Sequence, residues 1–132
     1  MKRYDCILID PSALLAVLLN EQNRGVVEKK TAGCLMAAPG CIHWEMGNAL
    51  YGVYKRNRVS LREAQCVFME FDSLPIRILD VDVNAALEIA IENHIPTYDA
   101  YYLQCALYFE FPLLTLDKRM MDIAQEIDVT VL

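Results

Sequence analysis

Four acidic residues of this chain follow or flank short apolar runs, and their side chains are of a type that binds divalent cations. They are Asp10, Glu45, Asp99 and Asp117. Four carboxylates in one pocket would repel one another strongly, so a shared site for them requires bound cations. Oxygen atoms are the ligands that hard ions such as Mg²⁺ and Mn²⁺ prefer. The set therefore favours metal-assisted chemistry, provided that the fold brings the four side chains together.

The elements that would position these acids alternate along the chain. Short apolar runs predict buried strands at 6–9, 35–38, 76–79, 112–115 and 129–131. Helical spacing predicts helices at 12–20, 21–32, 42–56, 60–72, from Asp82 onward, at 98–109 and at 118–126. Alternating strands and helices of this size predict a parallel sheet with helices on both faces, a three-layer α/β/α sandwich.

The predicted elements place the acids near one edge of such a sheet, where ligands bind beyond the carboxyl ends of the strands. Asp10 directly follows the first strand, and Asp117 comes two residues after the strand at 112–115. Asp99 lies in the first turn of a helix. Glu45 lies on the flank of an apolar helical stripe, where a glutamate is costly without a partner. All four can converge, although spacing alone does not require it.

Each acid also has a purely local explanation. Asp10 before Pro11 is an ordinary helix start, with Asp as the N-cap and Pro at the first helical position. Asp99 and Asp117 suit helix N-termini because of the helix dipole. Glu45 can be a half-exposed helix residue. Taken one at a time, the residues leave these alternatives open.

Together, four segments of the chain resemble the PIN-domain family. They are Ile-Leu-Ile-Asp-Pro-Ser at 7–12, Glu-Met-Gly-Asn-Ala-Leu at 45–50, Tyr-Asp-Ala-Tyr-Tyr-Leu at 98–103 and Leu-Thr-Leu-Asp at 114–117. Each segment alone is weakly specific, but the four occur in the family's order and span nearly the whole chain. One departure is Pro11, where the family more often has Thr or a small residue.

The resemblance implies a sheet of strand order 3-2-1-4-5 and a metal-dependent endoribonuclease of the VapC toxin type. It implies that Asp10, Glu45, Asp99 and Asp117 form the acidic site, with Mg²⁺ or Mn²⁺ as the cofactor. Ser12 and Thr115 match the family's polar residues, and we expect them to hold carboxylates by hydrogen bonds. It also implies a homodimer, and a small antitoxin protein that blocks the acidic groove.

RNA as a substrate requires basic contacts. Lys118 and Arg119 follow Asp117 directly, so they are the candidate phosphate contacts beside the site. For the basic residues at 55–58 a solvated helix face is the preferred interpretation. The net charge of −6 argues mildly against a protein that simply coats nucleic acid, but it is compatible with an enzyme whose carboxylates bind metal.

Other classes of protein fit less well. A length of 132 residues suits one compact domain, and the resemblance implies that 1–132 is a single PIN-like nuclease domain. The longest apolar run, 13–19, is far below the roughly 20 residues of a spanning helix, so we expect no membrane segment and a cytoplasmic location. The five cysteines are scattered and odd in number, which argues against a disulfide framework or zinc knuckle.

This chain lacks the residues that other classes of protein with an acidic site would need. A receiver domain would have paired acids at the first strand, and a haloacid-dehalogenase phosphatase would have an acid at position 12, where this chain has Ser12. His43 and His94 are isolated from any catalytic grouping. The alternative that stays open is a PIN scaffold that binds protein with little or no catalysis.

Overall fold

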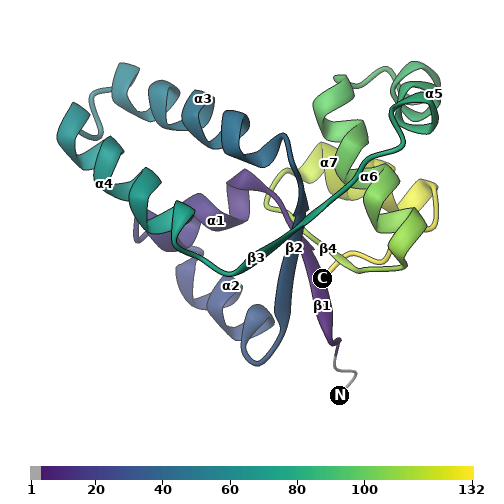
Figure 1. Cartoon of the computed structure of the whole chain (residues 1–132), viewed down its shortest axis with the longest axis horizontal. Helices are drawn as coiled ribbons and strands as arrows, with labels where there is room; N and C mark the ends of the chain where they lie inside the picture. The colour runs from purple at the N-terminus through teal and green to yellow at the C-terminus, as the bar shows by residue number, and fades with distance from the viewer. Residues whose placement is uncertain (1–3) are drawn as a thin grey trace.

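The computed structural model describes residues 4–132 and is built around a parallel sheet (Figure 1). Its strands are β1 (Cys6–Ile9), β2 (Leu35–Pro39), β3 (Ile76–Leu79) and β4 (Leu113–Leu114). They lie in the order β3-β2-β1-β4, with every pair parallel. This is the predicted order for the first four strands. The predicted strand at 129–131 is reduced to one parallel bridge, between Val131 and Leu113.

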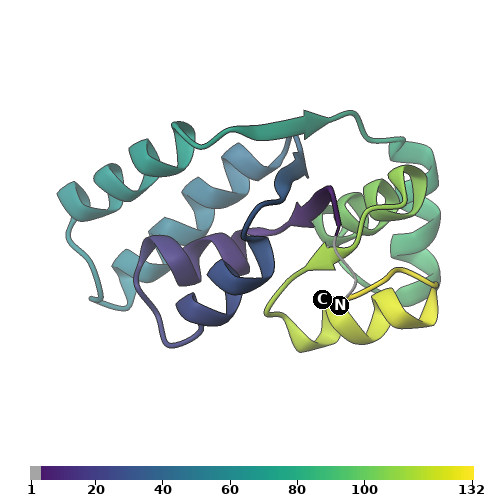
Figure 2. The same ribbon diagram turned by 90° about the horizontal axis from the view of Figure 1, so that it is seen from below.

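Seven helices flank the sheet in the described part of the chain. They are α1 (Pro11–Leu18), α2 (Arg24–Thr31), α3 (Ile42–Lys55), α4 (Leu61–Asp72), α5 (Val83–Asn93), α6 (Thr97–Phe109) and α7 (Lys118–Glu126). Helices α1 to α4 lie on one side of the strands and α5 to α7 on the other (Figures 1 and 2). The fold is therefore the predicted three-layer α/β/α sandwich.

Burial on both faces explains why the strands are short and apolar. All four residues of β1 are at most 8% exposed, and Leu113 and Leu114 of β4 are equally enclosed. A strand covered by helices on both sides has no polar face to show. The carboxyl end of β1 leads straight to Asp10, which is why a buried strand delivers a carboxylate to the edge of the sheet.

Side-chain caps set several helix starts. Ser60 and Glu63 form a reciprocal capping box that opens α4. Asp82 opens α5 by accepting a hydrogen bond from the backbone N–H of Ala85. Both starts were predicted from the sequence, because a cap depends on residues only three positions apart.

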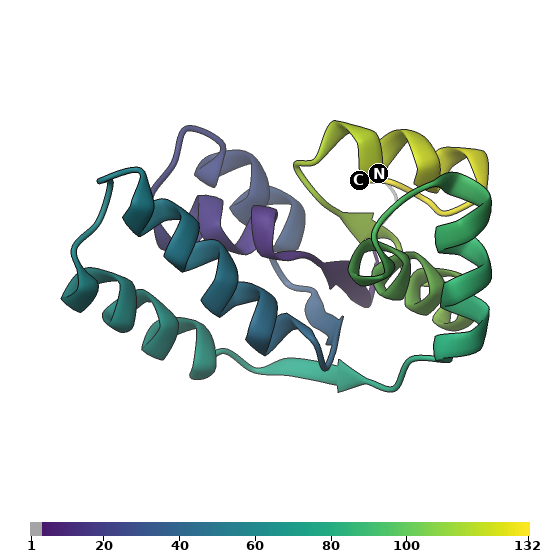
Figure 3. The ribbon, with the colours of Figure 1, turned by 90° about the horizontal axis from the view of Figure 1, so that it is seen from above.

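Helices α3 and α4 run side by side and extend away from the sheet as a pair (Figure 3). On the opposite side, α5 divides its apolar residues between two environments. Ala86 and Ala90 are buried, whereas Val83, Leu87 and Ile91 are exposed. Within residues 4–132 no helix has the length and apolar character needed to cross a membrane. All five cysteines are free thiols.

Candidate active site

Four helices begin around one cavity of about 520 Å³, and each start contributes one acid to it. Asp10 is the N-cap of α1, and Asp117 is the N-cap of α7. Glu45 and Asp99 stand in the first turns of α3 and α6. A helix N-terminus carries a positive partial charge, so all four positions favour a carboxylate. The cavity thus brings together the four acids that the sequence singled out.

Asp10 and Asp117 also cap the helices that they precede, as the local explanation of each acid predicted. Asp10 accepts a hydrogen bond from the backbone N–H of Ala13 at 3.1 Å, and Asp117 accepts one from that of Met120 at 3.2 Å. These are ordinary N-cap contacts. Capping and convergence are therefore not alternatives here, because the same two side chains do both.

Asp10 is the most enclosed acid of the cavity, at 5% exposure. The Ser12 hydroxyl donates to Oδ1 of Asp10 at 2.6 Å, and the Thr115 hydroxyl donates to Oδ2 at 2.5 Å. With the Ala13 N–H, three donors hold this one carboxylate. Ser12 and Thr115 thus stand where the sequence analysis expected them, in contact with a site carboxylate.

The same two hydroxyls also brace the segment that carries Asp117. Ser12 Oγ accepts a hydrogen bond from the Leu116 N–H at 2.9 Å, and Thr115 Oγ1 accepts one from the Asp117 N–H at 3.0 Å. The ends of β1 and β4 are therefore tied together by side chains. The position of Asp117 depends on the same contacts that fix Asp10.

Glu45 is held by Tyr102, a residue that the sequence analysis did not assign to the site. The Tyr102 hydroxyl donates to Oε2 of Glu45 at 2.5 Å, and the Cys41 thiol donates to the same oxygen at 3.7 Å. Tyr102 is almost fully buried. Tyr102 lies three residues after Asp99, and residues three apart share a helix face. This spacing could have indicated that Tyr102 faces the site.

Three further side chains line the cavity and were also missed. Asn48 lies three residues after Glu45 on α3 and so shares its face. Trp44 and Tyr98 line the cavity too, and both are largely exposed, Trp44 at 76%. Exposed aromatic rings can stack on planar groups such as nucleic-acid bases.

The electrostatic environment disfavours ionised carboxylates. Burial is the main cause that raises the pKa of Asp10, Glu45 and Asp99 above the usual carboxyl range. Neighbouring acids add to this, with Asp117 raising the pKa of both Asp10 and Asp99. The residues that line the cavity, all within the described chain, include no Lys, Arg or His. The acids therefore lack a positive partner inside the cavity.

The donor set fits a hard divalent cation. It consists of carboxylates from four elements, with the Asn48 side chain and hydroxyls nearby. Among residues 4–132, however, no three His, Cys, Asp or Glu side chains already stand close enough to hold an ion. Mg²⁺ does not require such a cage, because it keeps several waters and is often bound through one or two carboxylates. Asp10, Glu45, Asp99 and Asp117 are the residues that would hold it.

Lys118 and Arg119 lie beside the cavity and do not line it. Both are exposed at the start of α7. Arg119 donates a hydrogen bond to the backbone oxygen of His94 at 2.8 Å, and its charge lowers the pKa of Asp99 slightly against the larger effect of burial. Its guanidinium is thus anchored near the rim of the site.

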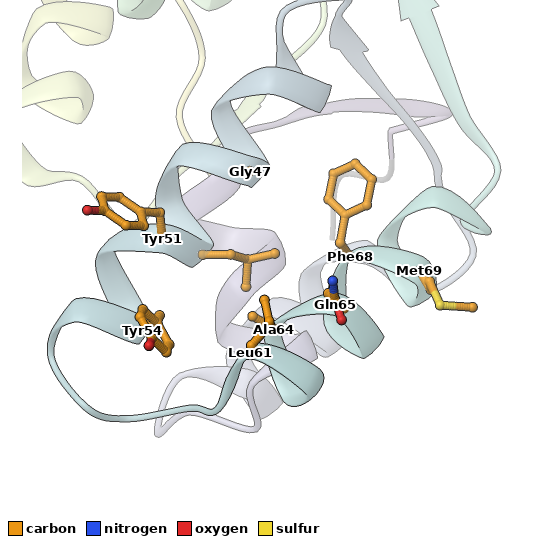
Figure 4. Close-up of a pocket in the computed structure, with 9 residues that line it drawn as sticks. Gly47, Tyr51, Tyr54, Leu61, Ala64, Gln65, Phe68 and Met69 are labelled. Atoms are coloured by element: carbon orange, nitrogen blue, oxygen red, sulfur yellow. The ribbon is translucent and has the colours of Figure 1, made fainter.

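A larger, apolar groove lies between α3 and α4, away from the acids (Figure 4). Its volume is about 740 Å³, and its lining is Gly47, Leu50, Tyr51, Tyr54, Leu61, Ala64, Gln65, Phe68 and Met69. No acid, base or thiol suited to catalysis is among them. The groove can bind an apolar surface, whereas the four carboxylates line the smaller cavity.

The fold and this cavity define the chain as an α/β/α sandwich with an acidic site at the carboxyl edge of its parallel sheet. Among solved structures, the crystal structure of PAE2754 from Pyrobaculum aerophilum matches it with a TM-score of 0.70 and 24% sequence identity. The match covers 89% of this chain and 78% of that one, and at this identity it shows the fold alone. No family model and no curated protein match the chain.

Proposed function

We propose that this chain is a PIN-type endoribonuclease that hydrolyses RNA phosphodiester bonds with Mg²⁺ or Mn²⁺. The observation that carries the proposal is the meeting of Asp10, Glu45, Asp99 and Asp117 in one cavity without a basic residue in its lining. Asp10 is buried, Glu45 and Asp99 are half-buried, and the pKa of each is raised, so their ionised forms lack a compensating positive charge. A bound cation would supply that charge.

In this proposal the chain's own residues position the reaction. Ser12 and Thr115 hold both oxygens of Asp10, while Tyr102 directs Glu45 through one oxygen and leaves the other free. Bound divalent ions would activate the attacking water and neutralise charge on the phosphate. Trp44 and Tyr98 flank the cavity where bases next to the cleaved bond can stack.

The biological setting is part of the same proposal. A nuclease of this kind would act in the cytoplasm as the toxin of a type II toxin-antitoxin pair, and as a homodimer. A small antitoxin protein would restrain it by covering the acidic cavity. Lys118 and Arg119 would contact substrate phosphates at the rim. Sedimentation of the purified chain tests the dimer, and a result of monomer at all concentrations would remove it.

The decisive experiment compares RNA cleavage by four proteins, with Mg²⁺ and with EDTA. The proteins are the wild type, Asp10→Asn, Asp99→Asn and the control Asp122→Asn, which changes an exposed aspartate outside the cavity. We expect EDTA to abolish cleavage. We expect each site variant to lose more than the roughly 100-fold that changes outside the direct ligands cost.

The control should cleave like the wild type, because Asp122→Asn makes the same charge change outside the site. Full cleavage by Asp10→Asn and Asp99→Asn, or wild-type cleavage unaffected by EDTA, would refute the proposal. Calorimetric titration with Mg²⁺ gives an independent reading, since all cavity variants should bind the ion more weakly.

A second candidate function is protein binding with little catalysis, and the apolar groove between α3 and α4 favours it. Leu61, Met69 and Tyr51 of its lining are more than half exposed, and an apolar groove between two helices is a surface on which an amphipathic helix can bind. The fitting partner is an amphipathic helix of a small antitoxin, whose apolar face would contact Leu61 and Met69. Wild-type protein that binds no Mg²⁺ and cleaves no RNA, yet loses its partner on Leu61→Glu, would favour this function instead.

A further inference from the structure

A second polar cavity lies next to the acidic one, and two arginines line it. Its volume is about 460 Å³. It shares Ser12 and Ala49 with the acidic cavity, so the two hollows adjoin across these residues. The arginines are Arg56 and Arg58, which follow the far end of α3, the helix whose first turn carries Glu45. One molecular surface therefore passes from an acidic site to a basic one.

The end of α3 explains why both arginines face the same hollow. Arg56 is the C-cap of the helix, and Asn57 adopts a left-handed backbone with φ of 58°. The N–H of Arg58 then donates back to the carbonyl oxygen of Val53 at 3.2 Å. This left-handed turn reverses the chain, so two residues that would otherwise diverge remain at one end of the helix.

The guanidinium of Arg56 lies along the helix. A Cβ placed on Gly52, one turn earlier, would be 3.5 Å from Nη1 of Arg56. Gly52 lines the same hollow, and this ordinary van der Waals distance places the Arg56 guanidinium beside it. The head group of Arg56 therefore faces the hollow next to Gly52.

The charges of the two arginines are not neutralised by acids. Within residues 4–132 the ion pairs join Arg24 to Glu28 and His43 to Asp72, and neither involves Arg56 or Arg58. Glu21 is the one carboxylate among the described residues that line the hollow, and it forms no ion pair with them. The lining therefore carries two positive charges against one negative charge, next to a site that carries four acids.

We propose that this hollow binds a backbone phosphate of the RNA strand, a few nucleotides from the bond that the acidic cavity cleaves. The inference rests on the proposed nuclease function. Eleven positions separate Glu45 from Arg56, so their backbones lie about 16 Å apart along the axis of α3. Guanidinium groups match phosphate oxygens in pairs, which makes arginine the suited residue here. The sequence analysis favoured a merely solvated role for these arginines.

The test measures binding of a labelled single-stranded RNA oligonucleotide, with Mg²⁺ present, in an Asp99→Asn background. In that background the proposed nuclease does not consume its ligand. We expect Arg56→Ala with Arg58→Ala to weaken binding by roughly tenfold at low salt. The slope of log Kd against log salt should fall by about 0.7 for each phosphate that the variant no longer neutralises.

Two companion variants separate binding from damage to the fold. Glu21→Gln removes the carboxylate that lines the hollow and should tighten RNA binding, which a structural role of the hollow would not produce. Arg77→Ala removes an exposed arginine of β3 outside the hollow and should leave affinity unchanged. Arg56→Lys with Arg58→Lys should restore most of the salt dependence, because lysine keeps the charge and loses the paired geometry.

The outcomes distinguish this inference from the proposed function. If the wild type cleaves RNA but the double alanine variant binds and cleaves like the wild type, the phosphate subsite is refuted and the nuclease stands. If the wild type cleaves nothing, yet RNA binding follows Arg56, Arg58 and Glu21 in the directions given, the nuclease fails and the subsite stands. Equal loss of affinity in Arg77→Ala would also refute the subsite.

Discussion

The buried Asp10 carboxylate is stabilised by hydrogen bonds to both of its oxygens. Both of its oxygens accept hydrogen bonds, from the hydroxyls of Ser12 and Thr115 and from the N–H of Ala13. These bonds lower its pKa, but burial raises it by more. The carboxylate is therefore fixed in place without being fully compensated, which suits a group that binds a cation.

Replacement of Thr115 by Val tests this arrangement. The change keeps the shape of a fully buried side chain but removes the hydroxyl that donates to Asp10 and accepts from the Asp117 N–H. We expect unfolding free energy to fall by about 1–3 kcal/mol, because two buried polar groups lose a partner. Mg²⁺ affinity, measured by calorimetry, should fall by roughly 10–100-fold. Thr115→Ser should recover most of both, and a Val variant with wild-type affinity would contradict the role given to Thr115.

At the scale of single residues, sequence patterns found the acids and not all of their partners. Ser12 and Thr115 were expected because they match polar residues of the family that the four segments resemble. Tyr102 was not, because its bond to Glu45 joins residues 57 positions apart. Spacing along a helix can show which side chains share a face, but it does not show which other helix that face meets.

Helix starts could be predicted where a capping residue lies within a few positions of the helix. The starts of α4, α5 and α7 follow from Ser60, Asp82 and Asp117, and α7 has the predicted bounds of 118–126. The last strand was overestimated, because the run at 129–131 has the pattern of a strand but pairs only through Val131. The turn that gathers Arg56 and Arg58 was not predicted either, since it depends on a left-handed Asn57.

Helices α5 and α6 are joined by one buried amide. The Gln104 side chain on α6 is 7% exposed, and its oxygen accepts a hydrogen bond from the N–H of Asp82, the N-cap of α5. Gln104→Met keeps the bulk of the side chain but leaves that N–H without its partner. Because Asp82 itself is exposed, we expect the free energy of urea unfolding to fall by about 1 kcal/mol, the net worth of one hydrogen bond. The same change at exposed Gln125 should stay within about 0.5 kcal/mol, and equal effects at both sites would contradict the linking role of Gln104.

The whole molecule combines a net charge of −6 with a cavity in which four of its acids meet. If RNA is the substrate, as proposed, this negative net charge would slow its approach. Local positive charge would then matter more than the net charge, and it lies at Arg56, Arg58, Lys118 and Arg119. Architecture at this scale could be predicted from the alternation of strands and helices. The adjacency of the acidic and basic hollows could not, because it depends on how α1 and α3 pack.

The pH dependence of stability follows from the raised pKa values of Asp10, Glu45 and Asp99. A carboxyl whose pKa is higher in the folded than in the unfolded protein binds its proton more tightly when folded. Its contribution is therefore present at low pH and is lost as pH rises from the ordinary carboxyl range through the raised pKa. In EDTA, we expect the Tm to fall as the pH rises from about 4, the ordinary carboxyl range, toward neutral. Mg²⁺ should reverse the loss at neutral pH, by about 2.7 kcal/mol at a concentration 100 times its Kd.

Asn variants test which carboxyl groups cause this pH dependence of the Tm. Asp99→Asn removes one titrating group and its repulsion of Glu45, so its Tm should depend less on pH and respond less to Mg²⁺ than that of the wild type. Asp122→Asn should keep both behaviours, because Asp122 is exposed and lies outside the cavity. A wild-type Tm that rises with pH in EDTA and ignores Mg²⁺ would mean that the four carboxylates are stable without a cation, and the metal site would lose its physical basis.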